Sequence, residues 1–389
     1  MLQKQKGVLY FTVFIDMVCF SMIFPVLPYL VKEMGLSTIS IGIIVSIFPL
    51  MNFLCSSYWG SLSDKVGRRP IMLLSIGITL GANVLLAFSH IGLLLFMARL
   101  LAGIGSANIG VAQAYITDIS TAETRTKNLG MVGAMFGLGF IVGPFVGSIL
   151  KEWSGAGSAL YVGLGAALLN GLNLISAHTY LTESNKHMNA DGKRTLNPFT
   201  NIIHWLQVPV VKQLMFLFFI YVTAFSMMQV TSGFLWASKY GISEREAGYL
   251  FVFIGVCSVV FQGALVGILV KKMSSRQMIM SGGIVMAIAL ALIPLPSKAN
   301  FWPVELCACA LLSLGNACIT PPLQSWITKV SGAQVIGQAL GANQSFGSIG
   351  RVIGPALGTI LFAYDMNIPF YVSACLMVVP LIIIFKLKA

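Results

Sequence analysis

A 38-residue stretch occurs twice in this 389-residue chain, and the duplication limits the fold more than any other feature. Residues 113–150 read QAYITDISTAETRTKNLGMVGAMFGLGFIVGPFVGSIL, and residues 324–361 read QSWITKVSGAQVIGQALGANQSFGSIGRVIGPALGTIL; without a gap, 13 of the 38 positions are identical. A period of 211 residues is too long for a solenoid, so the chain is predicted to be two copies of one unit. In membrane proteins, parallel repeats related by an axis along the membrane normal indicate a transporter.

The shared positions form a glycine–proline frame. In the first copy the frame consists of Gly130, Gly139, Gly143, Pro144 and Gly147. In the second copy it consists of Gly341, Gly350, Gly354, Pro355 and Gly358. Small residues let helix backbones approach closely within a membrane, and proline removes a backbone donor and bends a helix. Each frame therefore predicts a tightly packed helix.

Composition indicates that the solvent of most of the chain is lipid. Only 9% of the residues are charged, 57% are apolar and the mean hydropathy is +0.87, whereas soluble domains carry about 25% charged residues. The seven cysteines lie in apolar runs, which predicts buried small side chains. Neither metal-ligand spacing nor a nucleophile–base–acid arrangement is present, so we predict no enzyme, no metal site and no cofactor.

Each span requires about 20 mostly apolar residues, and twelve such stretches occur. They are residues 8–30, 40–62, 71–89, 92–116, 129–150, 159–181, 214–237, 247–270, 277–296, 302–327, 337–363 and 369–386. The predicted fold is an all-α polytopic membrane protein with twelve transmembrane helices in two pseudo-symmetric six-helix halves. The longest polar stretch sets the domains: an N-terminal half at 1–181, a cytoplasmic linker at 182–211 and a C-terminal half at 212–389.

The placement of Lys and Arg predicts the orientation. Of the 24 basic residues, seventeen flank the spans on one side, five flank them on the other, and Arg99 and Arg351 lie within spans. Cytoplasmic loops carry the excess of basic residues, so both termini and the linker are predicted to be cytoplasmic. The net charge of +12 is thus explained by topology and requires no nucleic-acid partner.

A short motif joins the second and third predicted spans. Residues 60–70 read GSLSDKVGRRP, in which Gly60, Gly67 and Pro70 favour a tight turn. Three charged residues of the motif are placed for contacts with other charges: Asp64, Arg68 and Arg69.

These residues carry a resemblance to a family. GxLxDxxGRRP in this loop resembles the signature of the major facilitator superfamily, and residues 99–103, RLLAG, resemble its membrane-embedded arginine motif. The frame at 130–147 is similar to the superfamily's antiporter motif. The opening LYFTVFIDMVCFSMIFPVLP (9–28) resembles the first span of its drug/proton antiporter branch, particularly the tetracycline exporters.

The resemblance implies a cytoplasmic latch. Asp64 would face the N-terminus of the eleventh span around residues 337–341, where a helix attracts anions, and Arg68 would pair with Asp118. The latch would hold the cytoplasmic side closed in the outward-open state; alternatively, these charges only fix topology and solubility. In the second copy Lys271, Ser274 and Lys329 replace Asp64, Gly67 and Asp118, so the pairing is expected mainly in the first half.

Three ionisable residues inside predicted spans are candidates for function, because charges at depth are costly. Burial opposes the charged form of a carboxylate and a nearby cation favours it, so Asp16 with Arg99 could bind and release a proton; the resemblance also places an acid here. The alternative is a permanent ion pair. Arg99 has Ala310 at its repeat position. Arg351 could attract an anionic group, pair with Asp16 or reach the interface.

Polar residues in other spans are weaker candidates for a substrate cavity, since each could equally bond a neighbouring helix. They are Gln113, Gln229, Asn316, Gln324 and Trp326, considered together with Arg351. Glu305, at the outer start of the tenth span, is predicted to lie at the membrane interface, with burial as the alternative. Tetracycline exporters carry an acid in span three where this chain has Ala82 or Asn83, which argues against tetracycline itself.

The predicted function is secondary active transport by alternating access: proton-coupled export of a drug or amphipathic metabolite across the cell (inner) membrane, by a monomer surrounded by lipid. One alternative is proton symport, or facilitated uptake, of a metabolite or organic anion. Another is a membrane receptor or scaffold that transports nothing. The sequence leaves the substrate open among drugs, siderophores and metabolites.

Overall fold

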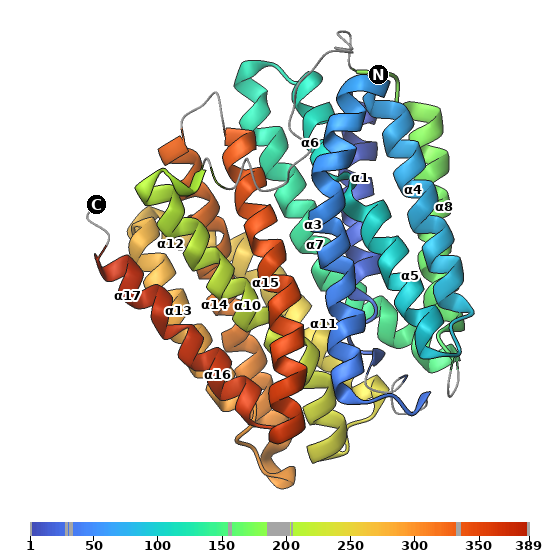
Figure 1. Cartoon of the computed structure of the whole chain (residues 1–389). Helices are drawn as coiled ribbons and strands as arrows, with labels where there is room; N and C mark the ends of the chain where they lie inside the picture. The colour runs from blue at the N-terminus through green and yellow to red at the C-terminus, as the bar shows by residue number, and fades with distance from the viewer. Residues whose placement is uncertain are drawn as a thin grey trace. The chain divides into compact units, whose positions relative to one another are not determined.

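The computed structural model consists of helices throughout the part of the chain that it describes (Figure 1), which is residues 2–27, 30, 34–154, 158–184, 203, 205–331 and 336–386. Nine helical segments among these residues are long and apolar enough to cross a membrane, and a tenth apolar helical segment, 368–384, is shorter. The predicted count of twelve spans stays a prediction, whereas the all-helical membrane architecture is confirmed.

The chain groups into two compact units. The first comprises residues 1–36 and 47–200, and the second comprises residues 37–46 and 201–389. Helix α3 (Thr38–Val66) contributes residues to both. The predicted domain limits at 181 and 211 stay predictions, and linker residues 185–202 and 204 lie outside the described part.

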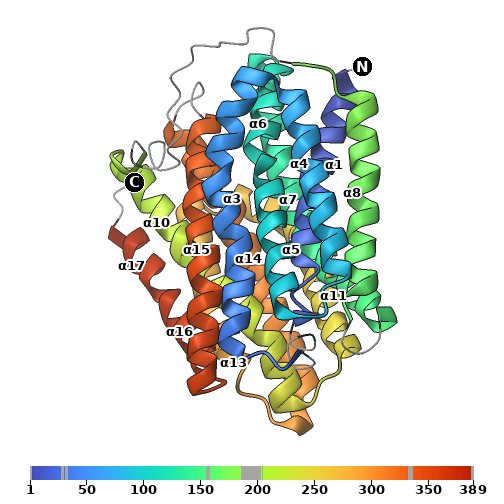
Figure 2. The same ribbon diagram turned by 45° about the vertical axis from the view of Figure 1, so that its right-hand side comes forward.

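The first unit is organised by two sets of helix contacts. One set packs α1 (Leu2–Ser21) against α7 (Ala122–Ser154) and α8 (Leu160–Tyr180). The other packs α4 (Arg68–Ala87) against α5 (Gly92–Gly105) and α8. A 3-10 turn at Ser106–Asn108 follows α5 and leads into α6 (Ile109–Asp118). Figure 2 shows α4 and α8 running alongside each other.

The second unit contains contacts that correspond to both sets, made by different helices. Helix α10 (Pro209–Leu235) packs against α15 (Ile336–Tyr364), and α14 (Phe301–Ser331) packs against α13 (Ser275–Leu292) and α11 (Glu244–Val260). Helices α16 (Ile368–Leu376) and α17 (Val378–Lys386) pack against α13. Two five-residue π-helical segments, Trp236–Tyr240 and Phe261–Leu265, interrupt the helices; the second leads into α12 (Val266–Lys272).

Both glycine frames are used for close helix packing. A Cβ atom built on Gly139 or Gly143 would lie 2.6 and 2.5 Å from the carbonyl oxygens of Phe14 and Val18 on α1. In the second unit, a Cβ on Gly354 would lie 2.6 Å from the carbonyl oxygen of Thr223 on α10. The duplicated frame thus makes the same kind of contact in each unit.

Two helix ends differ from the sequence prediction. The first span was predicted to be helical through residue 30, but α1 ends at Ser21 and turns follow to residue 26. Pro25 lacks an N–H and its ring disfavours the helical conformation of the preceding residue.

The predicted turn at 60–70 is also too long. Helix α3 continues through Gly60 to Val66, and Gly67 alone, with φ 113°, joins α3 to α4.

The packing of α7 on α1 predicts a position-specific effect of a larger side chain. Gly143→Val is expected to lower the free energy of unfolding by ~1–3 kcal/mol, the usual cost of overpacking, because the new Cβ meets Val18 at 2.5 Å. Gly137→Val on the same helix is the matched control, since a Cβ at Gly137 meets no atom of another helix within 4 Å. Thermal unfolding of the purified variants measures the difference. Equal unfolding temperatures for the two variants would contradict the assignment of Gly143 to the helix contact.

Candidate functional site

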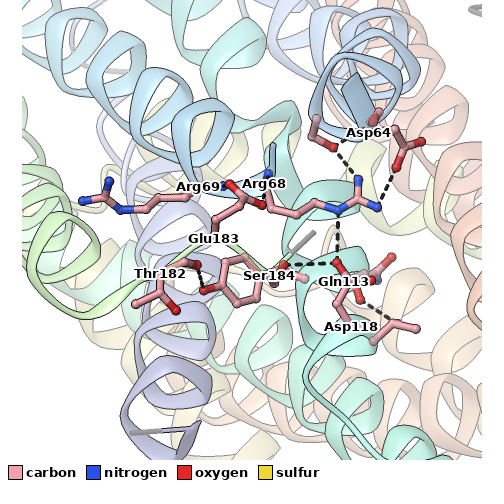
Figure 3. Close-up of polar contacts among 12 residues, drawn as sticks. Asp64, Arg68, Arg69, Gln113, Asp118, Thr182, Glu183 and Ser184 are labelled. Carbon is pink, nitrogen blue, oxygen red and sulfur yellow. Dashed lines mark hydrogen bonds and ion pairs between the residues drawn. The ribbon is translucent and has the colours of Figure 1, made fainter. Parts of the chain in front are cut away.

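Arg68 is the centre of a charged cluster in the first unit (Figure 3). Its Nη2 lies 2.6 Å from Oδ1 of Asp64, and its Nε lies 3.3 Å from Oδ2 of Asp118. Nη1 donates a hydrogen bond to Oγ of Ser63 at 2.6 Å. The guanidinium therefore joins the end of α3 to the end of α6. The side chain of Arg68 is only 9% exposed, so both carboxylates offset the cost of its burial.

Helix α4 begins without a capping side chain of its own. Its N-cap is Gly67, and the carboxylate of Glu183 accepts hydrogen bonds from the backbone N–H groups of Arg68 at 2.8 Å and Arg69 at 3.1 Å. A carboxylate at a helix N-terminus satisfies free N–H groups and interacts favourably with the helix dipole. A Cβ on Gly67 would lie 2.5 Å from Oε2 of Glu183, so glycine is required both for this approach and for the positive φ.

The segment after α8 is held to several helices of the first unit. Ser184 donates a hydrogen bond from Oγ to Oδ2 of Asp118 at 3.1 Å. Gln5 on α1 donates from Nε2 to Oγ1 of Thr182 at 2.7 Å, and the hydroxyl of Tyr115 on α6 donates to the Thr182 carbonyl. Residues 182–184, the first of the predicted linker, thus belong to the same cluster as Arg68 (Figure 3).

The corresponding junction in the second unit is built differently. Helix α13 has Ser274 as its N-cap, and Ser274 and Gln277 form a reciprocal capping box. This local cap requires no residue from another helix. The replacement of Gly67 by Ser274 therefore changes how the helix is capped. In the second unit α13 is capped by its own residues, whereas in the first unit α4 depends on the distant Glu183.

Asp16 lies in a polar stripe on α1. Its side chain is buried, and Thr12 and Cys19 lie one helical turn on either side on the same face. Thr12 donates from Oγ1 to Oδ1 of Asn173 at 2.9 Å, and Asn170 donates from Nδ2 to Sγ of Cys19 at 3.2 Å. Polar groups of α8 thus accompany the buried acid along α1.

Arg99 is buried in the same unit, on α5. Its guanidinium lies over the ring of Phe48, with 5.7 Å from Cζ to the ring centroid. Cys19 lies within electrostatic reach of both Asp16 and Arg99, which places all three side chains in one buried region. Nε and Nη1 of Arg99 have no hydrogen-bond acceptor among the described residues.

The second unit contains a polar cluster around Asn316. Its Oδ1 accepts hydrogen bonds from the hydroxyls of Tyr221 on α10 at 2.6 Å and Thr320 on α14 at 2.8 Å. Arg351 on α15 lies within electrostatic reach of Tyr221. Its Nη1 and Nη2 lie 3.4 Å from Oγ of Ser348 and Oε1 of Gln344.

The remaining candidates are more scattered. Gln229 on α10 is buried, and Gln324 and Trp326 are half-buried on α14. Gln113 lies on α6, near the Arg68 cluster in Figure 3. Arg69 extends to the end of α8, where its Nη2 donates to the carbonyl of His178 at 3.0 Å.

The expected contact of Asp64 with residues 337–341 spans the two units and stays a prediction.

Glu305 differs from the sequence prediction. An interfacial position was expected from its place at the start of a span, but its side chain is 0% exposed. Burial is possible because the indole of Trp236 donates from Nε1 to Oε1 at 2.9 Å. The prediction was wrong because a residue's depth in a helix does not reveal which aromatic side chains cover it.

Sequence reasoning also missed Glu183, Tyr221, Asn170 and Asn173. The two asparagines could have been found, because they are polar residues at i and i+3 in an otherwise apolar helix. Glu183 follows α8 with no local pattern that predicts a cap for α4, 115 positions away from Arg68.

Comparisons with known proteins agree with the helical architecture. The family model described as Major Facilitator Superfamily matches residues 9–355. Tetracycline resistance protein, class C, of Escherichia coli is 30% identical, covering 90% of this chain and 88% of that protein. Multidrug resistance protein 2 of Bacillus subtilis (strain 168) is 27% identical, with coverages of 95% and 91%. The human organic anion transporter MFSD10 (TETRAN) shares the fold, with a TM-score of 0.75, 20% identity and coverages of 98% and 99%.

The cap supplied by Glu183 can be tested by stability. Glu183→Ala is expected to lower the free energy of unfolding by ~0.5–2 kcal/mol, as for other lost N-caps. Glu183→Gln should lose less, because its single amide oxygen still accepts one hydrogen bond. Ser184→Ala is the neighbouring control, which leaves the cap intact. Thermal unfolding of the purified proteins orders the variants, and a Glu183→Ala protein as stable as the wild type would show that the cap is dispensable.

Proposed function

The chain belongs to the major facilitator superfamily, and on this premise we propose that it exports drugs or other amphipathic small molecules in exchange for protons. The observation that carries the proposal is the buried region that contains Asp16, Arg99 and Cys19. Curated relatives named for tetracycline, multidrug and quinolone resistance support the class of substrate.

Asp16 is proposed as the proton-binding group. A charged carboxylate inside the bilayer is costly, and binding a proton removes that charge. Arg99 provides a compensating cation when the proton leaves. Substrate and proton would therefore alternate at this region, because the binding of either changes the charge balance around Arg99.

The two six-helix halves at 1–181 and 212–389 are proposed to rock around a midplane site, with both termini and the 182–211 linker in the cytoplasm of a monomer in the cell (inner) membrane. The basic residues that flank the spans support this orientation. The cluster of Asp64, Arg68 and Asp118 is proposed as the latch that stabilises one of the two conformations. The glycine frames would keep each half rigid during this motion, because they pack α7 on α1 and α15 on α10.

The cluster around Arg351 is proposed to bind an acidic group where the substrate carries one. Arg351 presents a cation beside the hydroxyl of Tyr221, and Asn316 orients that hydroxyl. An amphipathic molecule with a carboxylate or enolate would pair with the guanidinium. The same observation supports the alternative, uptake of an organic anion by symport or facilitated diffusion. The direction of transport relative to the proton gradient separates the two.

Asp16→Asn tests the proton-binding role. In proteoliposomes with an imposed pH gradient, this variant is expected to lose gradient-driven accumulation of a fluoroquinolone and of ethidium, because its amide cannot release a proton. Asp365→Asn, on an exposed turn, should transport like the wild type. Unfolding temperatures confirm that both variants are folded. Wild-type accumulation by a folded Asp16→Asn protein would remove Asp16 from the mechanism.

A further inference from the structure

Glu305 is a second fully buried carboxyl group, and it lies in the unit that does not contain Asp16. It is located one turn after the start of α14 at Phe301 and is 0% exposed. Its Oε1 accepts one hydrogen bond from Nε1 of Trp236 at 2.9 Å. Its Oε2 has no hydrogen-bond partner among the described residues. A carboxylate usually accepts several hydrogen bonds, so this group is incompletely satisfied as an anion.

Aromatic side chains enclose Glu305. Trp236 and Tyr240 come from the five-residue π-helical segment after α10, and π turns inside helices occur frequently at functional sites. The ring of Trp236 lies 5.4 Å from that of Phe251, and the ring of Tyr240 lies 4.7 Å from that of Phe301. These four residues are each at most 9% exposed. The hydroxyl of Tyr240 also has no hydrogen-bond partner among the described residues.

No basic side chain within the described part of the chain pairs with Glu305. The titratable groups within electrostatic reach of Glu305 are Cys309 on α14 and Tyr240 after α10; Cys257 on α11 lies near Cys309, and Tyr371 on α16 lies near Tyr240. All four are uncharged types. Lys239 donates instead to the carbonyl of Pro294 at 2.5 Å and to Oδ1 of Asn367 at 2.9 Å.

The other helices that contact α14 bring no cation to Glu305 within the described residues either. On α11, Arg245 donates from Nε to the hydroxyl of Tyr249 at 2.7 Å. The ionisable residue of α13 is Arg276, in its first turn. On α15, Arg351 lies in the cluster with Tyr221, and Tyr364 is 82% exposed. The carboxyl group is therefore surrounded by aromatic and neutral groups, which disfavour its charged form.

The tight packing limits which cation could compensate the carboxylate. An organic cation would need a cavity, but the aromatic residues around Glu305 are packed ring against ring. Hard metal ions such as Ca²⁺ need six or more oxygen ligands, and no cluster of metal-ligating side chains exists among the described residues. A proton needs neither space nor additional ligands.

We propose that Glu305 is a proton-binding site of the second unit, which takes up a proton on Oε2 and releases it to water when the aromatic enclosure opens. The neutral acid keeps the hydrogen bond from Trp236 to Oε1, so protonation requires no rearrangement of that contact. Release leaves the carboxylate and a hydrated proton, which balances the step. The part of the inference that assigns this proton to the transport cycle rests on the proposed function.

The proposed topology gives the site a direction. Residues 302–327 form a span that enters from the outer side under that topology, so Glu305 lies near the outer end. Protons from outside would reach Glu305 over a short distance. Together with Asp16, the protein would then bind two protons per molecule, one in each unit.

Infrared difference spectroscopy of the full-length protein in lipid, titrated with pH and without substrate, tests the site. The C=O stretching band of protonated carboxyl groups is expected to grow as the pH falls. Glu305→Gln should remove a component equivalent to one carboxyl group, whereas Asp16→Asn should leave that component in place. Trp236→Phe should shift the frequency of the component, because the hydrogen bond to Oε1 is lost. The Gln variant retains an acceptor for Trp236, and its unfolding temperature verifies the fold.

The possible outcomes separate this inference from the proposed function. A titrating component that disappears only in the Glu305 variant supports the proton site, even if liposome transport proves independent of the pH gradient. An unchanged band in a folded Glu305→Gln protein overturns it. The proposal is also overturned if the Glu305 component has the same intensity at every pH tested, or if it is absent at every pH tested. In either case the carboxyl group would not exchange its proton.

Discussion

Close contact between helix backbones is the interaction on which the rest of this structure depends. In a bilayer, helices gain little from burying apolar surface, so van der Waals packing at small residues has to hold them together. Gly139 and Gly143 bring α7 against α1, and Gly350 and Gly354 bring α15 against α10 in the same way. Because Asp16 lies on α1 and Arg351 lies on α15, these contacts also fix where the two ionisable side chains are located.

The two units keep the frame and differ in their chemistry. The first places a buried acid and Arg99 near Cys19 and uses Glu183 to cap α4, so that Arg68 contacts residues from several helices. The second caps the equivalent helix with Ser274 and places a neutral aromatic enclosure around its own acid. Duplication thus supplied the scaffold, and divergence at a few positions supplied the groups that we propose to respond to protons and substrates.

The all-helical architecture and the glycine frames could be predicted from the sequence, because spans and frames depend on local composition and spacing. The family followed from the motif at 60–70 for the same reason. The cap at Glu183 and the burial of Glu305 could not be predicted, since each depends on a partner far away in the chain. The sequence predicted a turn that began at Gly60, but glycine can also lie inside a helix, and α3 continues through Gly60 to Val66. The turn is therefore limited to Gly67, whose φ is positive.

The most direct measurement of proton-coupled export is ethidium movement in proteoliposomes under pH gradients of either direction, with the membrane potential held at zero. Ethidium is a permanent cation, so it does not redistribute with pH in protein-free liposomes. The account predicts accumulation when the interior is more acidic than the medium, because outward proton flow drives inward substrate flow whatever the orientation of the protein. Accumulation only in liposomes with an alkaline interior would indicate symport and contradict the account.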